Sequence, residues 1–201
     1  MNKLLGLCGI IDFVNEKVGK AVNWLVLFAV LISSGNAMIR YTFNNSSNAW
    51  LEVQWYAFAA IFLLCSPYTL LRNEHIRIDV FSGKLSKRAQ TWIDILGAIF
   101  FLLPMTITIM WLSFPMVLDS FYRMEQSSDA GGLIRWPVKV LIPIGFFLLS
   151  AQGISELLKR VAFLAGAGPD PSERYHAHGS TANEELIEKE LASVIGTEQK
   201  P

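Results

Sequence analysis

Four long apolar runs divide this chain of 201 residues, and they constrain its fold more than any other feature. The runs are Ala21–Phe43, Trp50–Leu71, Trp92–Phe114 and Val138–Leu158. Each holds about 20 residues or more, which at about 1.5 Å per helical residue is enough to cross a hydrocarbon layer about 30 Å thick. The sequence therefore predicts an all-α integral membrane protein with four transmembrane helices at about 21–43, 50–71, 92–114 and 138–158.

The composition agrees with a membrane domain. Hydrophobic residues make up 52% of the chain and charged residues only 17%, whereas soluble domains are about 25% charged. The formal net charge is zero, so no basic face for nucleic acid is expected. We predict a cytoplasmic or interfacial N-terminal segment (1–20), one transmembrane domain (21–160) and a cytoplasmic tail (161–201).

Lysine and arginine are distributed unevenly around the four runs, with ten on one set of flanks and four on the other. The ten are Lys3, Lys17, Lys20, Arg72, Arg77, Lys84, Lys87, Arg88, Lys159 and Arg160, and the four are Arg40, Arg123, Arg135 and Lys139. Because basic residues concentrate on the cytoplasmic side, both termini and the central loop are predicted to be cytoplasmic. The outer loops would then be residues 44–49 and about 115–137.

The two terminal segments carry weaker patterns. Residues 4–18 fit a short interfacial amphipathic helix, whose apolar stripe would be Leu4, Leu7, Ile11, Val14 and Val18; a plain polar leader fits equally well. Residues 166–179 are typical of a linker, and residues 182–195 fit a short helix that follows a capping-box spacing from Thr181 to Glu184. Docking of this tail on a partner and disorder both remain open.

Ionisable residues occur only near the ends of the four runs, and each is a functional hypothesis because burying a charge in a membrane is costly. They include Arg40, Glu52, Asp94 and Glu156. We expect Arg40 and Glu52 to form an ion pair across the first outer turn, and Lys159 and Arg160 to neutralise the other two. Polar residues are expected to form hydrogen bonds between helices: Asn23, Ser33, Ser34, Asn36 and Gln152.

The sequence lacks the residues that several membrane functions require. His75, His176 and His178 lie outside the runs, which argues against axial haem ligands. No acidic residue lies in the middle of a run, and no zinc-protease, serine-hydrolase or nucleotide-binding motif is present. Cys8 and Cys65 suggest neither a disulfide nor a metal site. We therefore predict no catalytic residues, no bound metal and no cofactor.

One segment stands out after the second run. It reads Leu71-Arg-Asn-Glu-His-Ile-Arg-Ile-Asp79, and it is accompanied by Glu52, by Gly132-Leu-Ile-Arg-Trp136 and by Pro143-Ile-Gly145. Together with the four spans, these motifs resemble the small membrane subunit of tripartite ATP-independent periplasmic (TRAP) transporters. The resemblance covers about residues 15–160.

The resemblance implies a non-catalytic small permease subunit of a secondary transporter in the bacterial inner membrane. It implies a large multispan subunit, which this chain would scaffold, and a periplasmic substrate-binding protein, with sodium-driven uptake of an organic acid. Candidate residues for subunit contact or membrane positioning are Glu52, His75, Arg77, Asp79, Trp136, Pro143 and Gly145, together with Arg40 as the expected partner of Glu52. None is expected to bind substrate.

Two other functions remain as alternatives. An autonomous four-helix transporter would move a substrate when this chain alone is placed in liposomes. A membrane anchor of a redox enzyme would carry haem or quinone and absorb visible light. The sequence contains no residue that favours either alternative.

Overall fold

The computed structural model describes residues 2–43, 47–72 and 86–166. Its helices are α1 (Asn2–Phe43), α2 (Asn48–Leu71), α4 (Lys87–Gly97), η1 (Ala98–Leu102), α5 (Leu103–Tyr122) and α6 (Trp136–Leu164). α4, η1 and α5 follow one another without a break, so the described chain forms four long helical rods, each long and apolar enough to span a membrane. The prediction of an all-α protein with four spans is confirmed.

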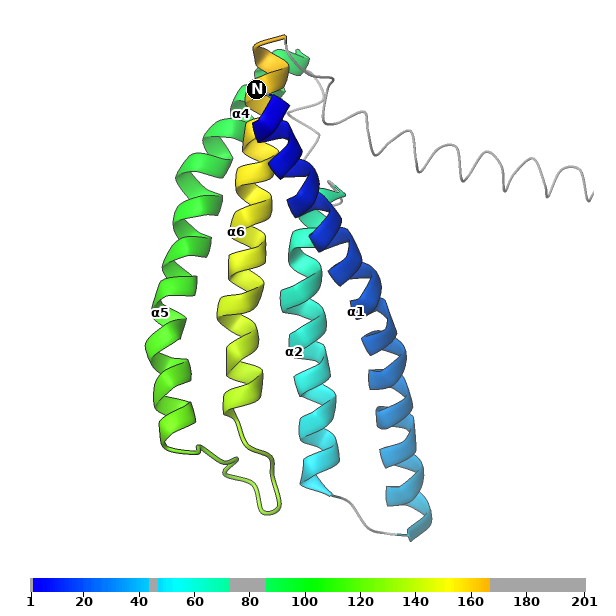
Figure 1. Cartoon of the computed structure of the whole chain (residues 1–201). Helices are drawn as coiled ribbons and strands as arrows, with labels where there is room; N and C mark the ends of the chain where they lie inside the picture. The colour runs from blue at the N-terminus through cyan, green and yellow to red at the C-terminus, as the bar shows by residue number, and fades with distance from the viewer. Residues whose placement is uncertain (1, 44–46, 73–85, 167–201) are drawn as a thin grey trace, which may run out of the picture.

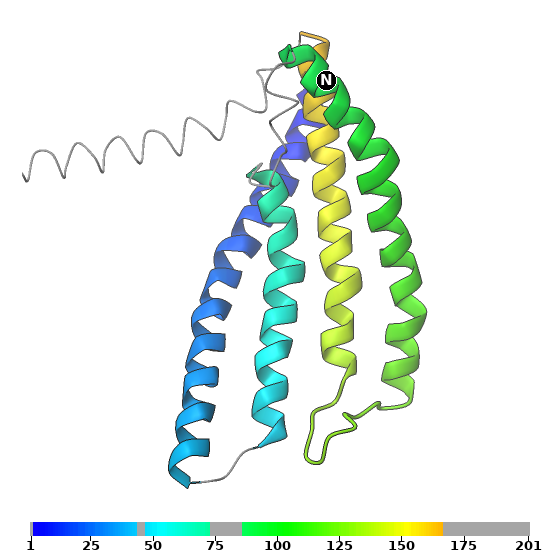
Figure 2. The same cartoon turned by 180° about the vertical axis from the view of Figure 1, so that it is seen from behind.

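The rods lie side by side in an open arrangement (Figures 1 and 2). α2 and α6 pack on each other in the middle, α5 packs on α6, and α1 packs on α2. The N-terminal half of α1 also crosses onto the C-terminal half of α6. Each outer rod therefore keeps a broad face without a neighbour from this chain.

The two ends of the structure differ. The N-terminus of α1, the start of α4 and the C-terminus of α6 lie together at one end, which we call the network end (Figure 1). The C-terminus of α1, the start of α2 and the loop 123–135 lie at the opposite end, which we call the hairpin end (Figure 1). α2 is the shortest rod, at about 36 Å, and it ends below the network end.

Burial in this structure is the reverse of that in a soluble protein. Many of the buried side chains are polar, including Glu52, Thr106, Ser150, Gln152 and Ser155. Large apolar side chains are exposed along the rods, and Trp24, Phe62, Phe101 and Trp111 each expose about three quarters of their surface. In water such apolar faces would be unfavourable. In a bilayer they contact lipid or partner helices, while polar groups bond inside.

α1 differs from the predicted N-terminal segment, because it is one continuous helix of 42 residues rather than an interfacial helix followed by a span. Its length is about 63 Å, twice the hydrocarbon thickness. The predicted apolar stripe does not pack against the rest of the chain, since Leu7 and Val14 are exposed. The buried stripe lies one position further along, at Cys8, Asn15, Val22 and Ala29, because polar partners on α6 bind that side.

The third rod also extends beyond its predicted bounds and runs from Lys87 to Tyr122. Pro115 lies inside α5, so the second outer loop covers residues 123–135 rather than about 115–137. The rod contains one π-helical turn, η1, just before Pro104. Proline has no N–H to donate to the carbonyl four residues earlier, and a widened turn accommodates this loss. The predicted tail helix 182–195 lies outside the described residues.

Candidate functional site

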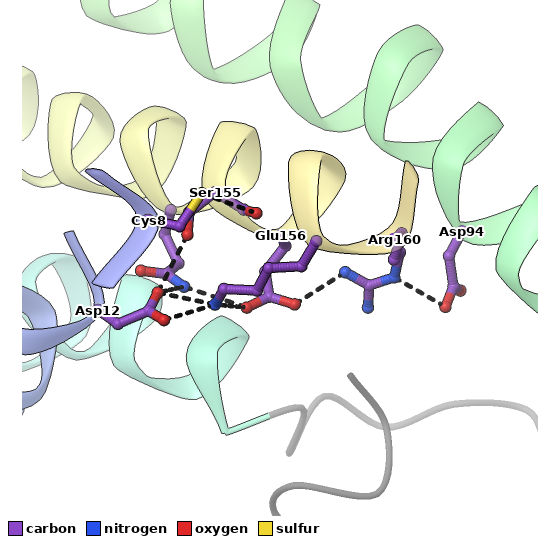
Figure 3. Close-up of polar contacts among 8 residues, drawn as sticks. Cys8, Asp12, Asp94, Ser155, Glu156 and Arg160 are labelled. Atoms are coloured by element: carbon purple, nitrogen blue, oxygen red, sulfur yellow. Dashed lines mark hydrogen bonds and ion pairs between the residues drawn. The ribbon is translucent and has the colours of Figure 1, made fainter. Parts of the chain in front are cut away.

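Charged side chains from three helices form a continuous network at the network end (Figure 3). Lys159 on α6 places its Nζ 2.6 Å from Asp12 Oδ2 on α1 and 2.8 Å from Glu156 Oε1. Arg160 extends the series, with Nη1 2.9 Å from Glu156 Oε2 and Nε 3.2 Å from Asp94 Oδ2 on α4. These five residues, the charge network, connect α1, α6 and α4.

Neutral polar groups complete the charge network. Asn15 Nδ2 donates a 2.7 Å hydrogen bond to Gln152 Oε1. Gln152 Nε2 in turn donates to Asp12 Oδ1 at 3.1 Å and to Glu156 Oε1 at 3.3 Å. Ser155 Oγ also donates to Asp12 Oδ1, at 3.1 Å. Asn15, Gln152 and Ser155 are almost fully buried, so these bonds compensate polar groups that would otherwise be costly.

The charge network confirms that Lys159 and Arg160 neutralise the acidic residues of the third and fourth spans. Sequence reasoning missed Asp12 and Asn15, which appeared to be surface residues of a polar leader. The available signal was the spacing of four and three residues from Cys8 to Asp12 to Asn15, which places all three on one helical face. With both cations satisfied by carboxylates inside the chain, the arrangement is that of a clasp between helices.

The loop at the hairpin end folds into a small β-hairpin, residues 123–135. Gln126 and Ile134 form an antiparallel bridge. Ser127 N donates to Leu133 O at 3.0 Å, and Arg135 N donates to Glu125 O at 2.9 Å. The loop is therefore an ordered element, although its glycines and serines are typical of a solvated connection.

One face of α2 holds this hairpin through three side chains spaced four residues apart. Asn48 Nδ2 donates to Ala130 O at 3.0 Å, and the Tyr56 hydroxyl donates to Ile134 O at 3.1 Å. Between them, Glu52 Oε2 accepts a 2.5 Å hydrogen bond from Leu133 N. Glu52 is 1% exposed, and a carboxylate that accepts a backbone N–H is a charge-assisted bond.

The predicted ion pair between Arg40 and Glu52 is wrong. The carboxylate of Glu52 points to the hairpin, where it binds Leu133 N and has Gly132 close to its Oε1. Arg40 lies exposed in the last turn of α1, and among the described residues no carboxylate forms an ion pair with it. Glu52 binds the hairpin rather than Arg40 because the hairpin brings a backbone N–H and the positive charge of Arg135 close to its carboxylate.

An ion pair also joins the hairpin to α6. Lys139 Nζ donates to Glu125 Oε2. This bond, with the positive charges of Lys139 and Arg135, holds the pKa of the Glu125 carboxyl below its ordinary value of 4.5. The folded hairpin therefore favours the ionised form of Glu125.

Three further candidates from the sequence serve contacts within the chain. Gly145 lies where α6 meets α2, and a Cβ there would be 2.8 Å from Leu63 O. Pro143, two residues earlier, is also buried. The Trp136 ring meets Phe121 edge to face, with centroids 5.3 Å apart. The candidates His75, Arg77 and Asp79 lie outside the described residues.

The five polar residues predicted to connect helices have different outcomes. Gln152 is at the centre of the charge network, as described above. Asn23 and Ser34 are exposed instead. A contact that the sequence analysis did not identify joins α5 to α6, where Ser150 Oγ lies 2.9 Å from Thr106 Oγ1. In the described part of the chain, no cluster of three or more histidine, cysteine and acidic side chains could hold a metal.

Comparison with known families decides what kind of protein has this arrangement. The family model for the DctQ component of tripartite ATP-independent periplasmic transporters matches residues 29–163, about two thirds of the chain. The chain belongs to the DctQ family. No curated relative and no solved structure matches it.

The match confirms the resemblance identified from the motifs. The chain is a small membrane component of a TRAP transporter, a multi-pass membrane protein and a member of a non-catalytic family. Membership implies two partners, the large membrane component and the periplasmic binding protein. The matched region begins within α1, so Asp12 and Asn15 of the charge network lie before it.

Proposed function

We propose that this DctQ chain is the scaffold of its transporter, and that it holds the large membrane subunit in position while that subunit moves the substrate. The family match carries this proposal. The sequence adds support, because residues 53–71, 95–118 and 140–155 contain no Asp, Glu, Lys, Arg or His in the interior of the helices. A protein that moved ions or organic acids by itself would be expected to carry ionisable groups there.

The arrangement of the helices supports a scaffold role. The charge network fastens α1, α4 and α6 at one end, and the hairpin fastens α2 to α6 at the other. Between these two ends, α1 and α5 each present exposed apolar faces. A frame that is rigid at both ends and apolar between them is suited to support a partner that moves against it.

We further propose that the network end faces the cytoplasm of a bacterium and the hairpin end faces the periplasm, with both chain termini inside. The distribution of lysine and arginine supports this orientation. A membrane-impermeant thiol reagent tests it. Ser128→Cys in the hairpin should be labelled in intact cells, whereas Ser180→Cys should be labelled only after the membrane is opened. The reverse pattern would contradict the orientation.

The transported substrate is proposed to be an organic acid, delivered by the periplasmic binding protein and driven by a sodium gradient. The test is uptake of radiolabelled organic acids by proteoliposomes. Liposomes with both membrane subunits, the binding protein and an inward sodium gradient should accumulate one of them. Liposomes with the chain alone should accumulate none. Uptake by the chain alone would support an autonomous transporter and contradict the scaffold.

The segment that follows α2 is proposed to contact the large subunit, which rests on its resemblance to the family motif. Charge reversal at Arg77 or Asp79 should lower recovery of the large subunit without altering substrate preference. Arg88→Glu, an exposed position in α4, is the matched control. Unchanged recovery in both segment variants would exclude these residues as contacts.

A further inference from the structure

A cavity of about 690 Å³ opens between α1 and α2 at the hairpin end. α1 contributes Ser33, Asn36 and Arg40 to its wall, and α2 contributes Leu51 and Gln54. The volume lies within the range of pockets that hold small molecules, about 300–1,000 Å³. Its lining combines one cation, two amides and the hydroxyls of Ser33 and Tyr41 with apolar carbon.

The polar groups of this cavity lie on the side of α1 that packs on α2. Ser33, Asn36 and Arg40 are spaced by three and four residues and continue the line of buried Ala29. Near Ala29 the two helices are in contact, and beyond it this face is polar and lines the cavity. Within the described chain, Arg40 has no carboxylate partner, because Glu52 is bound to the hairpin.

The depth of the lining residues in the membrane indicates which kind of ligand the cavity fits. Arg40 lies three residues before the end of α1, beside exposed Tyr41, and Trp50 is exposed in the first turn of α2. Aromatic residues of this kind mark the headgroup level of a membrane. Ser33 lies seven residues deeper, or about 10 Å along the helix, so the hydrogen-bond donors extend from the headgroup level toward the acyl chains.

We propose that the cavity binds one phospholipid of the leaflet at the hairpin end. The Arg40 guanidinium binds the phosphate, which matches its planar set of donors. The amides of Asn36 and Gln54 donate to the ester carbonyls below. The acyl chains continue deeper than Gln54, along the apolar surfaces of α1 and α2. A soluble anion would use Arg40 but would leave the deeper donors unpaired, so the lipid is the occupant that matches the whole lining.

Native mass spectrometry of the full-length chain, with palmitoyl-oleoyl phosphatidylglycerol added to the detergent, tests this proposal. The wild type should retain one lipid under activation that removes the others. Arg40→Gln should weaken this binding by roughly tenfold or more, since a charge-assisted bond is lost, and Arg40→Lys should restore part of it. Arg123→Gln is the matched control, because Arg123 is 77% exposed and lies outside the cavity.

A second variant tests the deeper hydrogen-bond donors, so that the result does not depend on the charge of Arg40 alone. Gln54→Leu has nearly the same volume and should also weaken retention of the single lipid. Retention that is equal in wild type, Arg40→Gln and Gln54→Leu would overturn the proposal. Displacement of the lipid by millimolar inorganic phosphate would also overturn it, since the occupant would then be a soluble anion. Loss of the large subunit in Arg40→Gln with unchanged lipid binding would show that the occupant is protein.

Discussion

At the scale of single residues, Lys159 is the cation that joins α1 to α6 in the charge network. Its ammonium lies between two carboxylates, Asp12 and Glu156, and only 10% of its side chain is exposed. Removing one member of a buried ion pair leaves uncompensated charge, which typically costs about 3–5 kcal/mol. The cost here therefore exceeds that of any ion pair at the surface, which is worth at most about 1 kcal/mol.

We predict that Lys159→Met lowers the free energy of unfolding in detergent by about 3 kcal/mol. Lys20→Met is the matched control, since Lys20 also pairs with a glutamate of its own helix but is 58% exposed. Its cost should stay below about 1 kcal/mol. Chemical unfolding followed by tryptophan fluorescence measures both. Equal costs for the two variants would show that the charge network does not stabilise the fold.

At Gly145, the backbones of α6 and α2 approach so closely that a residue without a side chain is required. A Cβ there would clash with the backbone carbonyl of Leu63, which cannot move aside as a flexible side chain could. Gly145→Ala should therefore separate α2 from α6 and cost about 1–3 kcal/mol. Gly35→Ala, with nothing within 4 Å of its added Cβ, should be neutral or stabilise α1 by up to about 1 kcal/mol. Thermal unfolding compares the two, and equal effects would contradict the close packing.

At the scale of elements, the hairpin 123–135 depends on α2 for its position. We predict that Glu52→Ala frees the amide of Leu133 and increases the rate of hydrogen exchange across residues 126–134 by about tenfold. This factor corresponds to the free energy lost with one hydrogen bond to a charged group. Asp119→Ala is the control, because Asp119 is 59% exposed and, among the described residues, forms its ion pair with the neighbouring Arg123. Unchanged exchange in Glu52→Ala would mean that the hairpin holds its shape without α2.

The same hairpin should respond to acid through Glu125. Its folded pKa lies below 4.5 because of Lys139, so its contribution to stability is complete above the unfolded pKa. That contribution is lost as the pH falls from about 4.5 through the lowered folded value. Glu125→Gln should therefore melt at a lower temperature than the wild type at pH 7, and the difference should shrink below pH 4. A difference that is independent of pH would contradict the role of the ionised carboxylate.

The sequence predicted the helices well where hydropathy alone decides them. The first and second spans end at Phe43 and Leu71 in both prediction and structure. The contact of the N-terminal half of α1 with α6 was missed because Asp12 and Asn15 resemble surface residues, and their partners on α6 lie 147 and 137 positions away. The partner of Glu52 was missed because it is a backbone N–H, which every residue except proline carries.

At the scale of the whole molecule, the four rods form an open frame in which about half of the buried side chains are polar and many large apolar side chains are exposed. The polar contacts lie at the two ends and along the line where α5 meets α6. The family motifs and the charge distribution predicted the kind of protein and the membrane class. They could not predict the part of the clasp that lies on α1, or the hairpin, because both depend on helices that meet only in the folded structure.

As a scaffold, this chain should work as part of a complex. The most direct measurement is affinity purification of the tagged full-length chain from its native membranes, cross-linked before mild solubilisation, with mass spectrometry of the proteins that accompany it. A large multispan membrane protein in stoichiometric amount is the predicted result. Recovery of the chain alone after cross-linking would contradict the scaffold function.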